Sequence, residues 1–230
     1  MVKLPEGFCI DSTEVTRSQY RAWLDGHPST AGQIAKCGWN DSFVPDPSCM
    51  GSPTDPKYVC QENCDNHPQV CIDWCDAYAF CRAMGKRLCG KIGGGSGSPT
   101  RIDQSQWVQA CSSNFTSIES YQGEFGLPFV CNGKAFWPQS TPPIACGTVP
   151  VGSLTTCQSG APGYEGVYDL SGNVAEFEDS CTAWNDGQDW CNIRGGSFAD
   201  NDDRLFCNSD IWQRREKVDA TIGFRCCSSP

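Results

Sequence analysis

Cysteine is the residue type that most constrains this chain. Its 230 residues include 18 cysteines, spread from Cys9 to Cys227 rather than gathered in one cluster. In a reducing cytosol so many thiols would be open to oxidation and metal capture, whereas in an oxidising compartment they pair as disulfides. The sequence therefore predicts a disulfide-rich protein of the secreted space, the periplasm or the cell surface. The alternative is a cytosolic protein with metal-bound thiols.

The spacing of the cysteines does not identify the pairs. Adjacent Cys226 and Cys227 would point to opposite faces of a strand, so we expect each to bond a different neighbour. The C-x3-C spacings at 60–64 and 71–75 lack the two-residue gap typical of zinc and iron–sulfur sites, which favours disulfides over metal. The cysteines expected to form structural disulfides, with their pairing open, include Cys71, Cys75, Cys81, Cys89, Cys207, Cys226 and Cys227.

Three segments carry helical patterns, and 24 glycines and 15 prolines indicate many loops between them. Thr16 opens the first helix with a capping-box pattern. Asp73 caps the second, which Gly85 ends, and Asp103 is expected to cap the third. The remainder is expected to be loops and short strands, among them "FRCC" at residues 224–227.

The charge and the histidine count exclude several functions. The formal net charge is −10, which disfavours binding to nucleic acid or to an anionic membrane surface. No apolar run is long enough to insert into a membrane, and the first residues lack the apolar core of a signal peptide, so an exported protein is expected to have had its signal trimmed. His27 and His67 are the only histidines, which leaves little for a catalytic triad or a histidine metal site.

The stretch "YDLSGNVAEFEDS", residues 168–180, is a candidate cation site. Asp169 and Glu176 flank a turn at Ser171 and Gly172, so both carboxylates could fold back onto one ion. Calcium binds six to eight oxygens and combines carboxylates with main-chain carbonyls. The alternative is a solvated acidic loop.

Seven motifs occur in a familiar order: "FCIDSTEVTRSQYRAWL", "NHPQVCIDWCDAYAFCRAMGKRL", "QSQWVQAC", "VPVGS", "GVYDLSGNVAEFEDS", "RGGSF" and "IGFRCC". Together they resemble the formylglycine-generating enzyme family, also called the sulfatase-modifying factor family. The match runs from about Phe8 to Cys227. The resemblance implies an α+β fold, formed by one compact domain over residues 1–230 with a C-type-lectin-like core and little regular secondary structure.

The resemblance also implies a structural Ca²⁺ at the stretch described above. By likeness to the family, Asp169 and Glu176 would bind the ion through their side chains. Gly172 and Val174 would bind it through their carbonyl oxygens.

The enzymes of this family oxidise a substrate cysteine to formylglycine with O₂ and with copper held by two cysteines. At the positions that the resemblance assigns to those cysteines, this chain has Asp200 and Leu205, and neither supplies a thiolate for Cu(I). Cys207 lies two residues too late and is interpreted as half of a disulfide, with Cys226 or Cys227 as the suggested partner. No catalytic and no cofactor-binding residue is therefore assigned. The alternative is a copper- and O₂-dependent oxidase of protein thiols.

The expected function is a non-catalytic, extracytoplasmic recognition or structural domain. Some relatives with this core display a variable C-terminal surface for ligands, and residues 199–221 occupy the equivalent place. Their mixture of acids, arginines and one tryptophan suits polar recognition of a protein, peptide or glycan. The candidate binding residues are Asp200, Asp202, Arg204, Trp212 and Arg214.

Overall fold

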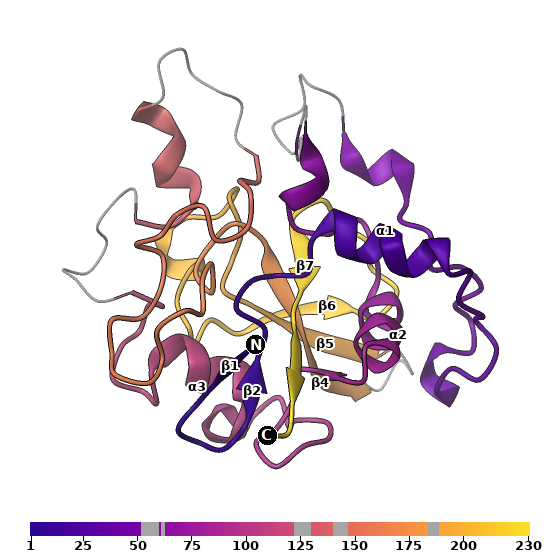
Figure 1. The fold of residues 1–230 in the computed structure, drawn as a ribbon, viewed down its shortest axis with the longest axis horizontal. Helices are drawn as coiled ribbons and strands as arrows, with labels where there is room; N and C mark the ends of the chain where they lie inside the picture. Colours follow the sequence, from indigo (N-terminus) through magenta and orange to yellow (C-terminus); the bar gives the residue numbers. More distant parts are fainter. Residues whose placement is uncertain (52–59, 61–62, 122–129, 140–146, 184–188) are drawn as a thin grey trace.

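Two four-stranded sheets organise the chain in the computed structural model (Figure 1). The structure describes residues 1–51, 60, 63–121, 130–139, 147–183 and 189–230, without the side chains of 137–139, 183 and 202. Short helices and long loops surround the sheets. The predicted α+β fold with little regular secondary structure is confirmed.

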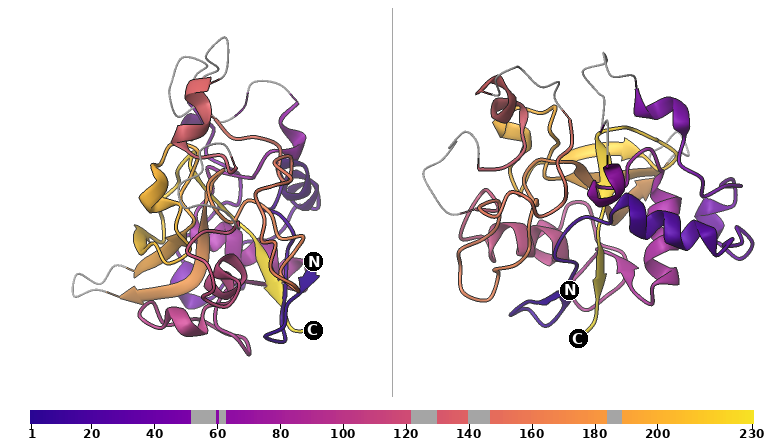
Figure 2. Two further views of the ribbon diagram at one scale, coloured as in Figure 1. Left: turned by 90° about the vertical axis from the view of Figure 1, so that its left-hand side faces the viewer. Right: turned by 45° about the horizontal axis from the view of Figure 1, so that its top comes forward.

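The first sheet joins the two ends of the chain. Its strand order is β1 (Val2–Lys3), β2 (Cys9–Ile10), β8 (Cys226–Ser228) and β3 (Arg87–Leu88), and every pair of neighbours is antiparallel. The termini therefore lie on the same side of the molecule, as two further views show (Figure 2).

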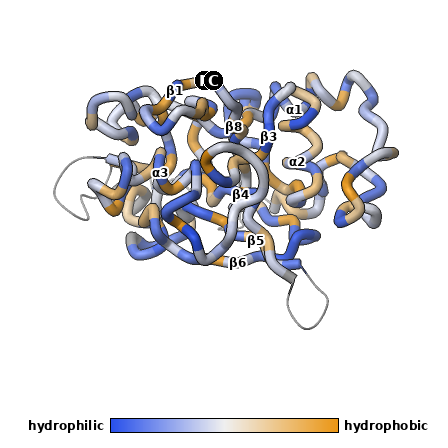
Figure 3. Tube along the Cα trace, turned by 90° about the horizontal axis from the view of Figure 1, so that it is seen from below, coloured by the Kyte–Doolittle hydropathy of each residue, from blue (hydrophilic) through white to orange (hydrophobic). Residues whose placement is uncertain are grey.

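The second sheet lies away from the termini (Figure 3) and carries the candidate site. Its order is β6 (Ile211–Arg214), β5 (Asp189–Arg194), β4 (Ala175–Ala183) and β7 (Ile222–Phe224). Strand β7 runs parallel to β4, while the other pairs are antiparallel. The predicted "FRCC" strand is thus divided, because Arg225 separates β7 in one sheet from β8 in the other.

Three α-helices are present in the described residues: α1 (Arg17–Asp25), α2 (Trp74–Ala83) and α3 (Gln106–Ser112). Thr16 and Asp73 cap α1 and α2, as predicted, and both form capping boxes, of which only the one at Thr16 was predicted. The cap of α3 is Ser105 rather than Asp103, because Asp103 belongs to a preceding 3-10 turn and the Ser105 hydroxyl accepts a hydrogen bond from Val108. The 3-10 helices are η1 (Ala35–Cys37), η2 (Pro47–Met50), η3 (Cys64–Asn66), η4 (Ile102–Gln104), η5 (Lys134–Gln139) and η6 (Asp202–Arg204).

The described part of the interior has four apolar clusters, of which two are large. One packs α1 and α2 against the second sheet, with Tyr20 stacked on Phe80 at 5.5 Å between ring centroids. The other surrounds α3 and contains Phe8 and Trp107. No helix in the described part of the chain is both long and apolar enough to cross a bilayer.

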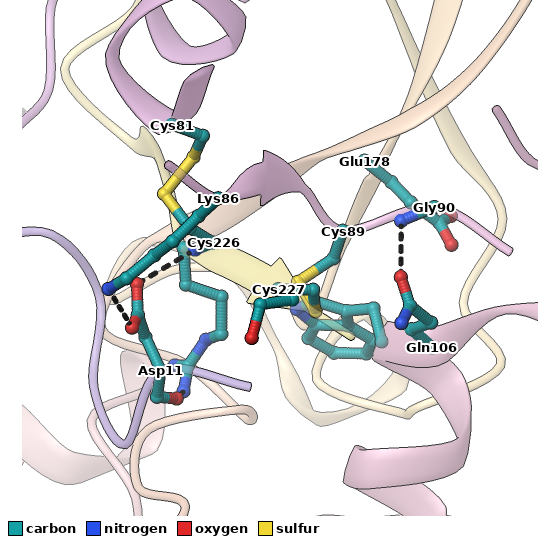
Figure 4. Close-up of a disulfide and its surroundings, with 12 residues drawn as sticks. Asp11, Cys81, Lys86, Cys89, Gly90, Gln106, Glu178, Cys226 and Cys227 are labelled. Atoms are coloured by element: carbon teal, nitrogen blue, oxygen red, sulfur yellow. Dashed lines mark hydrogen bonds and ion pairs between the residues drawn. A yellow bond between two sulfur atoms is a disulfide. The ribbon is translucent and has the colours of Figure 1, made fainter. Parts of the chain in front are cut away.

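Eight disulfides connect these elements among the described cysteines, and the expected disulfide-rich character is confirmed. Cys226 and Cys227 bond different partners on either side of β8, as their adjacency predicted (Figure 4). Cys207 is bonded to Cys111, so the suggested partners Cys226 and Cys227 were wrong. The pairs are Cys37–Cys75, Cys49–Cys71, Cys60–Cys64, Cys81–Cys226, Cys89–Cys227, Cys111–Cys207, Cys131–Cys157 and Cys181–Cys191.

Candidate functional site

The stretch predicted to bind calcium enters β4 through a tight, buried turn. Asp169 and Gly172 both have left-handed backbone, with φ of 61° and 83°. At Gly172 a Cβ atom would lie 2.5 Å from the carbonyl oxygen of Asn132, so glycine is required there. Val174 and Glu176 follow, and both are fully enclosed. The four predicted residues therefore share one buried segment rather than a solvated loop.

The carboxylate of Glu176 is bound by two side chains that the sequence did not indicate. Arg225 donates to both of its oxygens, with distances of 2.6 Å from Nη2 to Oε1 and 2.7 Å from Nε to Oε2. The indole of Trp107 donates to Oε2 at 2.8 Å. Because these bonds engage both oxygens, the side chain of Glu176 in this arrangement does not fit the role of a calcium ligand.

Arg225 is itself completely buried and fully engaged. Beyond Glu176, it donates to the main-chain carbonyls of Asp11 at 3.1 Å and Tyr168 at 2.8 Å. Its Nη2 also lies 4.0 Å from the carboxylate of Glu14. The guanidinium group therefore joins the N-terminal segment, the turn before β4, and β4 itself. A buried glutamate requires a charged or hydrogen-bonding partner. The need of Glu176 for such a partner is the one signal that could have pointed to Arg225.

A pair of carboxyl groups, those of Glu14 and Asp169, lies beside the Arg225–Glu176 ion pair. Glu14 accepts from the side-chain amide of Asn173 at 2.8 Å, and Asp169 accepts from the amide of Gly152 at 2.6 Å. Each carboxyl group has a further buried oxygen that receives no donor from the described residues. The two groups are close enough to share a hydrogen bond, and one proton held between them would give both oxygens a partner.

Burial keeps this pair protonated to higher pH. It raises the pKa of Asp169 to about 6 and the pKa of Glu14 well above its usual value, and in Glu14 the nearby charge of Asp169 adds to the effect. Above pH 4 the folded state therefore binds more protons than the unfolded state, so stability falls as the pH rises through 6. Each such proton changes the free energy of unfolding by about 1.4 kcal/mol per pH unit.

We expect Asp169→Asn to weaken this pH dependence. Asparagine tolerates left-handed backbone, and its amide could donate to the free oxygen of Glu14. The melting temperature of the native protein should be lower at pH 8 than at pH 5, and the variant should lose part of that fall and be more stable at pH 8. Asp103→Asn, at an exposed position, is the control. An equal fall in both variants would contradict the shared-proton arrangement.

Metal chelation tests the calcium prediction directly. The family resemblance predicts calcium binding by the four residues, whereas the side-chain contacts of Glu176 favour the opposite result; among the described residues no group of three or more histidine, cysteine or acidic side chains is arranged to hold a metal. Because Arg225 already neutralises Glu176, we expect excess EDTA to leave the melting temperature unchanged. A clear fall, reversed by added Ca²⁺, would instead support the predicted ligands, since a bound ion stabilises the native state by mass action.

The positions assigned to the copper cysteines lie in the loop after β5. Asp200 accepts from the amide and hydroxyl of Ser197, at 3.0 and 2.6 Å. Leu205 is buried and packs against Gly133 and Gly196. Cys207 follows in its disulfide with Cys111. Among the described cysteines, Cys9 alone is outside a disulfide, and it lies on β2 in the other sheet; Cys146 lies outside the described residues.

The predicted binding residues form two groups. Arg204 pairs with Asp200 at 3.5 Å in and beside η6, where the side chain of Asp202 lies outside the described residues. On β6, Trp212 is half-buried opposite Asn192, and Arg214 lies 5.4 Å from the ring centroid of Trp190. The first group is thus held within the loop after β5, and the second packs against β5 itself.

The fold and these buried contacts define a disulfide-stapled α+β domain in which a buried Arg–Glu pair ties the chain ends to the second sheet. The chain belongs to the family of the sulfatase-modifying factor enzyme 1-like domain, which matches residues 1–230. The resemblance noted in the sequence is thereby confirmed. No curated protein sequence matches the chain.

Solved structures show the same fold at low sequence identity. CarF is 20% identical with a TM-score of 0.63, and the match covers 97% of this chain and 86% of CarF. PvdO from Pseudomonas aeruginosa is 19% identical with a TM-score of 0.61, over 97% and 80% of the two chains. Treponema denticola variable protein 1 is 17% identical with a TM-score of 0.57, over 97% and 84%.

Proposed function

We propose that this chain is a non-catalytic recognition or structural domain. One observation carries the proposal: Asp200 and Leu205 stand where the resemblance places a copper-binding cysteine pair. The nearest cysteine, Cys207, is held in a buried disulfide with Cys111. An aspartate hydrogen-bonded to Ser197 and a buried leucine provide no soft ligand for Cu(I).

The disulfides support a role outside the cytoplasm. Several of them join elements that are far apart in the sequence, such as Cys81 with Cys226 at a separation of 145 residues. Bonds of this kind form and persist in oxidising compartments. We propose the secreted space, the periplasm or the cell surface as the location.

For recognition we propose the surface formed by η6 and β6. Arg204 and Arg214 are exposed there, and Trp212 adds an aromatic side chain, a combination that is common at protein interfaces. The ligand would be a protein, peptide or glycan. Structural Ca²⁺ is not required by this proposal, and its test is the chelation experiment above.

Copper titration tests the non-catalytic role. The native protein is expected to bind no stoichiometric Cu(I) against a competing chelator and to consume no O₂ with a cysteine-bearing peptide. The double variant Asp200→Cys with Leu205→Cys restores thiols at the assigned positions and should bind Cu(I), because thiolates are strong ligands for this ion.

Two controls make the copper result specific. Cys9→Ala removes the thiol on β2, which is outside a disulfide in the described structure, and should leave the Cu(I) titration unchanged. Asp200→Ser with Leu205→Ser alters the same positions without adding thiols and should bind no Cu(I). Stoichiometric binding together with O₂ consumption by the native protein would overturn the proposal and establish the oxidase.

A further inference from the structure

A cavity of about 270 Å³ lies between α1, α2 and the loop at residues 28–43. Figure 1 shows both helices on the same side of the molecule, away from α3. The cavity shares no residue with the buried Arg–Glu pair or with the surface on η6 and β6. Its volume lies just below the range typical for drug-sized ligands, so it fits one ring with its substituents.

Aromatic side chains form its walls. Trp23 and Phe43 contact each other with 5.0 Å between ring centroids, and Tyr78 supplies the side formed by α2. These rings are held from behind, because Trp23 packs on the edge of Phe80 at 5.5 Å and Tyr78 stacks on Trp74 at 4.8 Å. The walls are therefore fixed in place before any ligand binds.

The loop that closes the cavity is also held firmly. Cys37 bonds Cys75, which ties the loop to α2. Asn40 donates to the buried carboxyl group of Asp76 at 2.8 Å, and the hydroxyl of Tyr20 donates to the carbonyl of Phe43 at 2.8 Å. A preformed cavity costs little ordering on binding, which favours a genuine ligand site.

Arg82 is the one charged residue among the described residues that line the cavity. It is exposed at the rim, and its guanidinium lies 5.9 Å from the ring centroid of Tyr78. No described carboxylate lies within 4.0 Å of it, in contrast to most arginines of the described chain. A guanidinium group beside an aromatic wall is suited to bind a carboxylate through paired hydrogen bonds.

We propose that this cavity binds a compact aromatic group that carries one carboxylate. The ring would lie between Trp23, Phe43 and Tyr78, and the carboxylate would pair with Arg82. A free aromatic acid and the C-terminal residue of a peptide both present this chemistry. The site goes beyond the proposed surface on η6 and β6, and neither depends on the other.

The test compares N-acetylphenylalanine with its neutral amide, N-acetylphenylalaninamide. Binding is followed by calorimetry and by the NMR signal of the Trp23 indole, assigned with Trp23→Phe. The native protein should bind the acid about fivefold more tightly than the amide, as expected for a partly exposed ion pair. Arg82→Gln should remove this preference while leaving the affinity for the amide unchanged. Arg101→Gln, at an exposed position outside the cavity, should retain the preference.

A filled cavity provides a second test. Ala79→Trp places a large side chain inside and should weaken both probes at least tenfold, with an unchanged circular dichroism spectrum as the check on folding. The proposal is overturned if neither probe moves the Trp23 signal at about 10 mM, if acid and amide bind equally, or if the preference survives Arg82→Gln. A comparison of the affinities for 3-phenylpropanoate and N-acetyl-Gly-Gly-Phe then distinguishes the two sources. Tighter binding of 3-phenylpropanoate indicates a free aromatic acid, and tighter binding of N-acetyl-Gly-Gly-Phe indicates the C-terminal residue of a peptide.

Discussion

A variant that lacks both disulfides of strand β8 is expected to be largely unfolded at room temperature. Cys81–Cys226 and Cys89–Cys227 tie this strand to α2 and to the residue after β3, across separations of 145 and 138 residues. Each bond alone closes a long loop of the unfolded chain, but the two bonds join neighbouring positions, so the second bond adds only a short ring to the first. Replacing one pair by alanine should therefore lower the free energy of unfolding by about 3 kcal/mol. Without both bonds the cost should reach about 7 kcal/mol, which is comparable with the total stability of a domain.

Denaturant unfolding of the two single-pair variants and of the combined variant measures this effect. The matched control is Cys60→Ala with Cys64→Ala, because that disulfide spans a separation of only 4 residues and should cost about 2 kcal/mol or less. A combined variant that is no less stable than either single-pair variant would show that β8 is held by packing and hydrogen bonds alone.

Replacement of Arg225 by methionine is expected to lower the free energy of unfolding by about 3–5 kcal/mol. The change removes the partner of a fully buried carboxylate, and Glu176 keeps only the indole donor of Trp107. It also leaves the carbonyls of Asp11 and Tyr168 without their guanidinium donor. Lysine should not replace arginine fully, because one ammonium group cannot reproduce the fork that engages both carboxylate oxygens.

A double-mutant cycle separates the ion pair from general loss of packing. Glu176→Met removes the unpaired charge, so the combination Arg225→Met with Glu176→Met should be more stable than Arg225→Met alone. Arg101→Met is the control, since its pair with Asp103 is exposed and should contribute less than about 1 kcal/mol. A loss below about 1 kcal/mol for Arg225→Met would contradict the role of Arg225 as the connecting cation.

Local signals in the sequence predicted the helices well. The caps at Thr16 and Asp73 depend on residues only three positions apart, so they could be identified without tertiary information. At α3 two candidate caps compete: Asp103 fits the pattern, but the short turn η4 places Ser105 at the helix start instead. The backbone path of the preceding loop decides which candidate caps the helix, and that path cannot be predicted from local sequence patterns.

The candidate site was only partly predictable because its contacts cross the whole chain. Family resemblance grouped Asp169 and Glu176 as ligands of one calcium ion, and that grouping stays a prediction. The resemblance gave no sign that Arg225, 49 residues later in the sequence, donates to Glu176, or that Glu14 approaches Asp169. The adjacency of Cys226 and Cys227 predicted two different partners, but the identity of each partner depends on which strands flank β8.

The pairing of β2 with β8 has an architectural consequence for how the domain can be displayed. Its two ends meet in one sheet, and the hydroxyl of Ser228 lies 3.5 Å from the sulfur of Met1. A short linker can therefore join them, so circular permutation or insertion into a host loop should preserve the fold. Any tether attached at either end would leave from the same side of the domain, and the partly exposed edge strand β6 of the second sheet would lie on the opposite side.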